Sequence, residues 1–154
     1  MKIYKISTNI QFIRGENAET LTQATGEAGI GYYFSPITNI KMAEYYTKDS
    51  KHVWLASSKD NCNIIDLTFN EHIEGIISMI KENTERMKRD YEHYIVPNVN
   101  RSNYQRFPYS VEQYINEKFS NVDAYLISHN AVGIPSGKQL VIRNLEAFEL
   151  EQIR

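Results

Sequence analysis

Histidine and cysteine side chains, which often bind metals or act as nucleophiles, are few in this sequence and form no recognisable motif. The histidines are His52, His72, His93 and His129, and the one cysteine is Cys62. Their spacing matches no metal-binding pattern, and there is no HExxH segment. Cys62 has no second cysteine to pair with and no adjacent base to activate it, so we expect a small buried side chain. The sequence therefore predicts no metal site.

The short motifs of nucleotide-binding and hydrolytic enzymes are also missing. Gly29-Ile30-Gly31 is a GxG element, but it lacks a third glycine and precedes a strand-like segment, which excludes a Rossmann motif. There is no GKS or GKT element of a phosphate-binding loop, and no GxSxG nucleophile elbow. Glu112 and Glu117 flank a helix-like segment and do not suggest a glycosidase pair.

Three separated segments carry the strongest indication of function. The first is Ile3-Tyr4-Lys5-Ile6-Ser7. The second is Gly31-Tyr32-Tyr33-Phe34-Ser35, followed by Ala43-Glu44-Tyr45. The third is Gly137-Lys138-Gln139-Leu140-Val141-Ile142-Arg143-Asn144. In this order the segments resemble the conserved core of ADP-ribosyltransferases, closer to the branch of diphtheria toxin and the poly(ADP-ribose) polymerases.

The resemblance implies a fold, a substrate and a set of site residues. The fold is an α+β, ADP-ribosyltransferase-like split β-sheet core with a helical insert at 68–119, and the chain 1–154 is one domain. The substrate is NAD, which donates ADP-ribose to a protein or nucleic-acid acceptor without a metal. The resemblance implies NAD contacts at Lys5, Ile6, Ser7, Tyr33, Ser35 and Tyr45, and catalytic roles for Gln139, Tyr33 and Lys5.

The chemistry of NAD cleavage gives each of these residues a role. Loss of nicotinamide creates positive charge on the ribose, so the site must hold the ring rigidly and stabilise that charge. The resemblance assigns binding of the nicotinamide ring to Tyr33 and Tyr45, and binding of its carboxamide to backbone groups of Lys5 and Ile6. The glycines at 29 and 31 would let the strand approach the ligand closely. Gln139 stands where the family has its catalytic glutamate, and Lys5 where it has a histidine or arginine.

Gln139 leaves two functions open. Its amide can accept a hydrogen bond from a ribose hydroxyl but carries no negative charge, and losing one such group costs on the order of 10²–10³ in rate. The chain is then either an active mono-ADP-ribosyltransferase, of the kind typical of bacterial toxins, phage-encoded modifiers and anti-defence proteins, or an inactive module that binds NAD, ADP-ribose or a protein. A third alternative is an unrelated structural or inhibitory protein that acts through the long helix at 68–94 or the loop after Pro97.

Hydrophobic periodicity predicts the elements that position these residues. Strands are expected over 3–7, 32–35, 53–57, 63–67, 124–128 and 138–143. A short helix is expected over 18–24, and a second, capped by Thr38, carries Met42, Ala43 and Tyr46. Capping boxes at 68–71 and 110–113 open two further helices, the first closed by Pro97, with a polar surface loop over 98–108. Grouped helices and clustered strands favour an α+β fold over a doubly wound parallel sheet.

Composition and charge narrow the expected partners and the cellular compartment. The 154 residues carry a net charge of −2, so nonspecific nucleic-acid binding is not expected. The chain starts with Met1-Lys2-Ile3 and has neither a signal-like apolar segment nor an apolar run of membrane-spanning length. A single cysteine fits a reducing compartment. We therefore expect a cytoplasmic protein with no membrane partner.

Overall fold

The computed structural model describes residues 11–26, 28–130 and 132–154. Its strands are β1 (Gln11–Glu16), β2 (Ala24–Gly26), β3 (Gly29–Pro36), β4 (His52–Ser58), β5 (Ile64–Asp66), β6 (Ala124–His129), β7 (Gly137–Ile142) and β8 (Phe148–Gln152). Its α-helices are α1 (Ile40–Thr47), α2 (Asn70–Asp90) and α3 (Pro108–Lys118), and its 3₁₀-helices are η1 (Tyr104–Arg106) and η2 (Leu145–Ala147).

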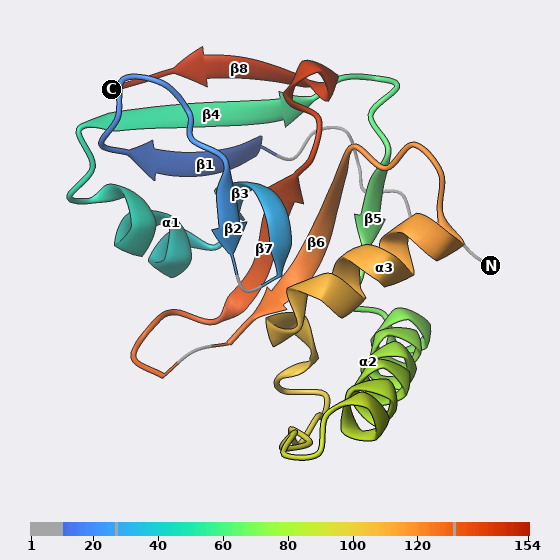
Figure 1. The fold of residues 1–154 in the computed structure, drawn as a ribbon. Helices are drawn as coiled ribbons and strands as arrows, with labels where there is room; N and C mark the ends of the chain where they lie inside the picture. The colour runs from blue at the N-terminus through green and yellow to red at the C-terminus, as the bar shows by residue number, and fades with distance from the viewer. Residues whose placement is uncertain (1–10, 27, 131) are drawn as a thin grey trace.

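The strands form one curled sheet in the order β5-β6-β7-β3-β1-β4-β8, with β2 paired to β3. Every neighbouring pair is antiparallel except β5 and β6. Figure 1 shows β1, β4 and β8 running across the molecule, whereas β5, β6 and β7 run in a different direction. The predicted α+β class is confirmed.

Strand β3 joins the two halves of the sheet. It pairs with β2 and then β1 along one side and with β7 along the other, where Tyr33 lies opposite Val141. Gly31 permits this approach to β7, because a Cβ there would lie 2.6 Å from the Val141 side chain and 2.7 Å from the Ile142 carbonyl oxygen. Since side chains alternate along a strand, Tyr33 and Ser35 share one face of β3, and Gln139 and Val141 share the same face of β7.

Each face of the sheet has its own hydrophobic core. On the face that carries Val141, helices α2 and α3 contribute the buried residues Ile73, Ile76, Ile80, Val111, Tyr114 and Ile115. On the opposite face, the buried side chains include Phe12, Phe34, Leu126, Leu140 and Phe148. The predicted apolar stripe of the long helix is therefore a core face over its first half.

Two elements near the start of the described chain differ from the prediction. Residues 18–24 are not a helix: 18–23 are irregular, and residue 24 is the first of β2. The Glu16 carboxylate explains this, because it accepts hydrogen bonds from the Thr22 backbone N–H (3.2 Å) and hydroxyl (2.8 Å) and so offers this backbone a partner outside a helix. Strands β1, β2 and β8 were not predicted.

The predicted helix caps were wrong in detail. Asn39, not Thr38, caps α1, and its Oδ1 accepts from the Met42 N–H at 3.2 Å. Thr68 does not cap α2, because its hydroxyl donates to Asp66 instead and Phe69 precedes the helix. Ser110 lies inside α3, which begins at Pro108.

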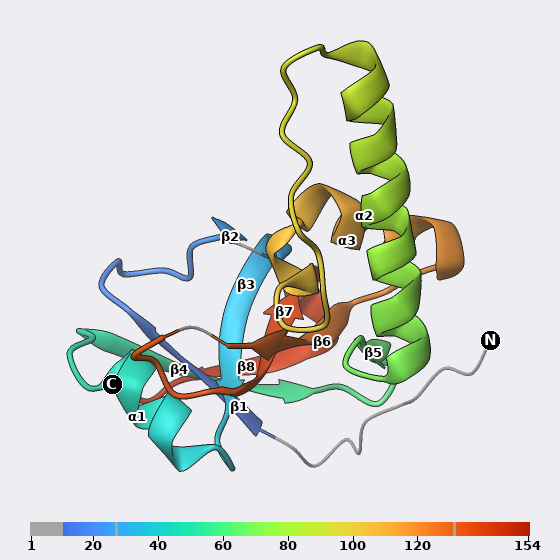
Figure 2. The same ribbon diagram turned by 90° about the horizontal axis from the view of Figure 1, so that it is seen from below.

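Helix α2 ends at Asp90 and not at Pro97. Figure 2 shows it extending away from the sheet, with an extended segment leading back from its far end. Met87 and Tyr91, which belonged to the predicted stripe, are exposed. The returning segment was predicted to be a surface loop, but it contains η1, whose Tyr104 and Gln105 are buried. Within the described chain, no helix combines the length and apolar character needed to cross a membrane.

Candidate functional site

A cavity of about 280 Å³ lies where the two halves of the sheet meet. Its described lining comes from strands β1, β2, β3, β6 and β7, from helix α1, from η1 and from the turn between β2 and β3. The polar and aromatic residues of that lining are Arg14, Tyr33, Ser35, Tyr46, Gln105, Ser128, His129 and Gln139. The site therefore draws on residues from nearly the whole described chain.

Strands β3 and β7 bring three of the predicted site residues together. Tyr33, Ser35 and Gln139 all line the cavity. Ser35 is 2% exposed and Gln139 is 9% exposed. Gln139 pairs with Ile127 of β6, whose side chain also lines the cavity, so the amide lies on the cavity face of the sheet.

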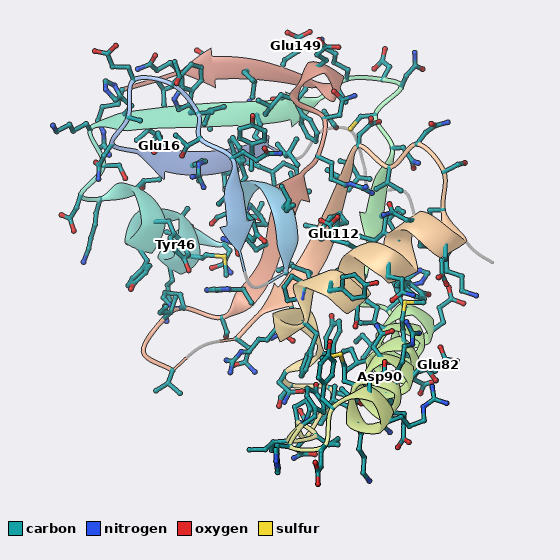
Figure 3. The ribbon with its side chains drawn as sticks, in the orientation of Figure 1. Glu16, Tyr46, Glu82, Asp90, Glu112 and Glu149 are labelled. Atoms are coloured by element: carbon teal, nitrogen blue, oxygen red, sulfur yellow. The ribbon has the colours of Figure 1, made fainter. Side chains whose placement is uncertain are left out.

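Helix α1 presents a different tyrosine from the predicted one. Tyr45 is 41% exposed and does not line the cavity, whereas the next residue, Tyr46, does. One residue along an α-helix turns the side chain by about 100°. Figure 3 labels Tyr46 on α1. The expected second aromatic ring is present in the cavity, but it belongs to Tyr46.

Tyr46 and His129 form a close pair at the cavity wall. The Tyr46 hydroxyl and His129 Nε2 share a hydrogen bond of 2.6 Å, and the ring centroids are 5.8 Å apart. His129 is the last residue of β6 and lies opposite Gly137 of β7. Its side chain is therefore a diagonal neighbour of Gln139 on the same face of the sheet. A histidine at this position can accept or donate a proton next to a bound ligand.

Arg14 of β1 is the only Lys or Arg in the described lining of the cavity. Its Nη1 donates to the Tyr33 carbonyl oxygen at 2.8 Å, and its Nη2 lies 3.2 Å from Glu16 Oε2. Partial burial alone would raise the pKa of the Glu16 carboxyl, but hydrogen bonds from Thr22 and the charge of Arg14 hold it below its usual range. The pair ties β1 to the backbone of β3 beside Tyr33.

The start of β3 is held by helix α3. Glu112 Oε1 accepts from the Ile30 N–H at 2.9 Å, and the Tyr33 hydroxyl donates to the Gly29 carbonyl at 2.5 Å (Figure 3 labels Glu112). Gly29 has φ +122°, and a Cβ there would lie 2.4 Å from the Tyr125 hydroxyl. Gly29 and Gly31 thus serve the packing of β3 and do not line the cavity, contrary to the expectation that they admit a ligand.

The helical insert contributes Gln105. This residue lies in η1, is 4% exposed and lines the cavity. Its Nε2 donates to the Ser102 carbonyl at 3.1 Å, while its Oε1 has no hydrogen-bond partner among the residues described. A residue of the cavity wall therefore carries a buried acceptor that no described residue bonds.

The predicted residues Lys5, Ile6 and Ser7 lie outside the described residues, so their roles stay predictions. Sequence reasoning missed Arg14, Gln105 and His129 as cavity residues. Tyr46 had a usable signal, because the predicted α1 helix placed it on the same face as the buried Met42. Gln105 had none, since it lies in a polar stretch.

Cys62 lies in a separate, more open cavity with Asp123 and Glu146. Partial burial, together with the Asp123 charge, raises the pKa of the Cys62 thiol to about 11. The thiol is therefore protonated at neutral pH and poorly suited to nucleophilic chemistry. Among the described residues, no cluster of histidine, cysteine, aspartate and glutamate could hold a metal ion.

The cavity at the sheet junction is lined by two tyrosine side chains together with amide, hydroxyl, imidazole and guanidinium groups. Its described lining contains no aspartate or glutamate. Comparisons with protein-family models, with curated proteins and with solved structures find no match to this chain.

Proposed function

We propose that this protein binds NAD in the cavity at the sheet junction and transfers ADP-ribose to a macromolecular acceptor. The observation that carries the proposal is the common location of Tyr33, Ser35 and Gln139. Their types and order in the chain were selected by resemblance to ADP-ribosyltransferases, and they line one cavity although β3 and β7 are far apart in sequence. The sheet, with two halves in different directions and a helical insert between β5 and β6, suits the split-sheet core of that family.

The size of the cavity indicates which part of NAD it receives. At about 280 Å³ it lies just below the range of drug-sized ligand sites, roughly 300–1,000 Å³. It therefore suits the nicotinamide end of the dinucleotide, with the remainder lying across the surface. Tyr33 and Tyr46 supply the rings that hold the nicotinamide, and Tyr46 takes the role that the sequence assigned to Tyr45.

The remaining residues of the cavity lining suit the transfer reaction at C1′ of the ribose. The bond between C1′ of the ribose and the nicotinamide nitrogen breaks, and its electron pair leaves with nicotinamide. An acceptor hydroxyl forms the new bond to C1′ and loses its proton. Gln139 accepts a hydrogen bond from a ribose hydroxyl, and the Tyr46–His129 pair takes the proton. Arg14 adds a cation on β1 beside Tyr33, whereas Lys5, to which the resemblance gives the charged position of the early strand, lies outside the described residues.

The test is transfer of label from NAD carrying a labelled ADP-ribose moiety to lysate components by the purified protein. Tyr33→Ala abolishes transfer because it removes one wall of the ring site. Tyr109→Ala is the matched control, since Tyr109 is 71% exposed on α3 and does not line the cavity. Both variants are checked for folding by thermal unfolding. If the wild-type protein shows no transfer and no NAD hydrolysis in any lysate, the enzymatic proposal is overturned.

A second candidate function is binding of NAD or ADP-ribose without chemistry. It is favoured by the lack of aspartate and glutamate in the described lining of the cavity. Calorimetry separates the two functions, because a binding module takes up NAD without turnover. Binding itself raises the free energy of unfolding by about 2.7 kcal/mol when NAD is present at 100 times its Kd. Failure of NAD and ADP-ribose to bind would exclude both functions.

A further inference from the structure

The open acceptor of Gln105 is an unusual feature of this fold. The side chain is 4% exposed, and its Oε1 has no hydrogen-bond partner among the described residues. Its orientation is fixed, because Nε2 donates to the Ser102 carbonyl at 3.1 Å and a flipped amide would bring two oxygens together. Most buried polar side-chain atoms in native proteins are hydrogen-bonded, so an open one on a residue of a cavity wall points to a ligand donor.

The position of Gln105 is rigid. Tyr104 is fully buried, and its hydroxyl donates to the Leu67 carbonyl at 3.1 Å. Arg106 Nη2 donates to the Asn130 carbonyl at 2.8 Å, just after the end of β6. These bonds hold η1 against the strand that carries His129. The acceptor is therefore held in place at the cavity wall before any ligand arrives, which favours selective binding.

We infer that Gln105 Oε1 accepts a hydrogen bond from the carboxamide NH₂ of the nicotinamide ring, so that the helical insert selects the amide form of the dinucleotide. This inference rests on the proposed function. NAD carries two NH₂ groups, one in the nicotinamide carboxamide and one on the adenine ring. The cavity suits one end of the molecule, and the same lining carries Tyr33, Tyr46 and Gln139, which the proposed chemistry puts at the nicotinamide end.

The test compares two dinucleotides that differ at one group. In 3-acetylpyridine adenine dinucleotide a methyl group replaces the carboxamide NH₂, with no change in charge and with the carbonyl retained. Calorimetry of the wild-type protein should give at least about tenfold tighter binding of NAD, because the analogue leaves the buried acceptor open. Gln105→Met removes the acceptor at similar volume and brings the two affinities together. Gln152→Met is the control, since Gln152 is exposed on β8, and it should keep the wild-type ratio.

The outcomes separate this inference from the proposed function. Equal binding of both dinucleotides by the wild-type protein overturns the role of Gln105 and leaves the NAD site standing, and it needs no variant. The role is also overturned if Gln105→Met folds, binds NAD and keeps the wild-type preference for NAD over the analogue. If Gln105→Met does not fold, Gln105→Leu replaces it. Failure of both dinucleotides to bind the wild-type protein overturns the inference together with the proposed function.

Discussion

Buried polar side chains occur in two regions of this molecule, and the regions treat them differently. Away from the cavity, Asp66 of β5 and Ser110 of α3 are bonded within the chain: Asp66 accepts from the Thr68 N–H at 2.9 Å, and the Ser110 hydroxyl accepts from the Asn83 amide at 2.9 Å. At the cavity, Ser35, Gln105 and Gln139 are equally buried, and Gln105 has an open acceptor among the described residues.

The difference teaches which residues serve folding and which serve a ligand. A buried polar group with its partner supplied by the chain contributes to stability, and removing that partner costs about 1–3 kcal/mol. A buried polar group that faces a cavity gains its partner only when a ligand binds. Substitutions of groups bonded within the chain should therefore change stability, and substitutions at the cavity should change activity.

The largest expected effect is on catalysis at Gln139. Gln139→Glu supplies the negative charge that opposes the developing ribose cation and should raise the transfer rate on the order of 10²–10³-fold. The measurement is label transfer from NAD under single-turnover conditions. Gln139→Leu should abolish transfer while leaving the unfolding free energy unchanged or higher, since an apolar group replaces a buried amide. No gain with Gln139→Glu in a folded, NAD-binding variant would remove Gln139 from the proposed chemistry.

Asp66 represents the region away from the cavity. Its carboxylate accepts from the Thr68 N–H and hydroxyl and lies 2.7 Å from Lys138 Nζ. Asp66→Ala should lower the unfolding free energy by about 2 kcal/mol, mainly through the lost Thr68 bonds, because the Lys138 side chain is 50% exposed. Urea unfolding measures the loss.

Two further substitutions sharpen the Asp66 experiment. Asp66→Asn keeps an acceptor for Thr68 and should cost less than Asp66→Ala. Asp60→Ala, at an exposed position, should have little effect. An Asp66→Ala protein with wild-type stability would contradict the division between the two regions.

His72 makes the stability of the helical region depend on pH. Burial lowers the pKa of His72 from its usual value, and the charges of Glu71 and Asp66 oppose this only in part. The unfolded chain takes up the proton at about pH 6.5, whereas folded His72, bonded to the Tyr114 hydroxyl at 2.9 Å, does so only at lower pH. This contribution to stability is complete above pH 7 and is lost as the pH falls below about 6.5, by at most ~1.4 kcal/mol per pH unit.

The measurement for His72 is the difference in unfolding free energy between pH 7 and pH 5. His72→Gln should reduce that difference, whereas His93→Gln, at an exposed position, should leave it unchanged. Equal pH dependence in all three proteins would show that His72 does not titrate differently in the folded and unfolded states.

The parts of the site that could be predicted are those set by strand periodicity. Tyr33 and Ser35 alternate on a β-rich aromatic segment, and Gln139 alternates with Val141, so their common orientation follows from local sequence. Arg14 was missed because 11–16 contains an adjacent Phe12-Ile13 pair and a glycine and lacks clean alternation. Its strand forms through pairing with β3 and β4, which are distant in the chain.

The helical insert shows a different limit of prediction from the sequence. Gln105 lies in a polar stretch that predicts a surface loop, and its burial depends on bonds from Tyr104 to Leu67 and from Arg106 to Asn130. No local pattern encodes such contacts. Helix α2 was assigned correctly where Ile73, Ile76 and Ile80 meet the sheet. Its end was misplaced because the apolar spacing continues through Met87 and Tyr91, which are exposed.

The smallest expected effect separates two neighbouring tyrosines of α1. Tyr46→Phe removes only the hydroxyl bonded to His129 and keeps the ring in the cavity, so the transfer rate should fall about fivefold, equivalent to ~1 kcal/mol. Tyr45→Phe is the matched control, because Tyr45 lies outside the cavity and should keep the wild-type rate. The same transfer assay at pH 7 measures both. A loss with Tyr45→Phe and none with Tyr46→Phe would restore the original assignment from sequence and place the ligand on the outer side of α1.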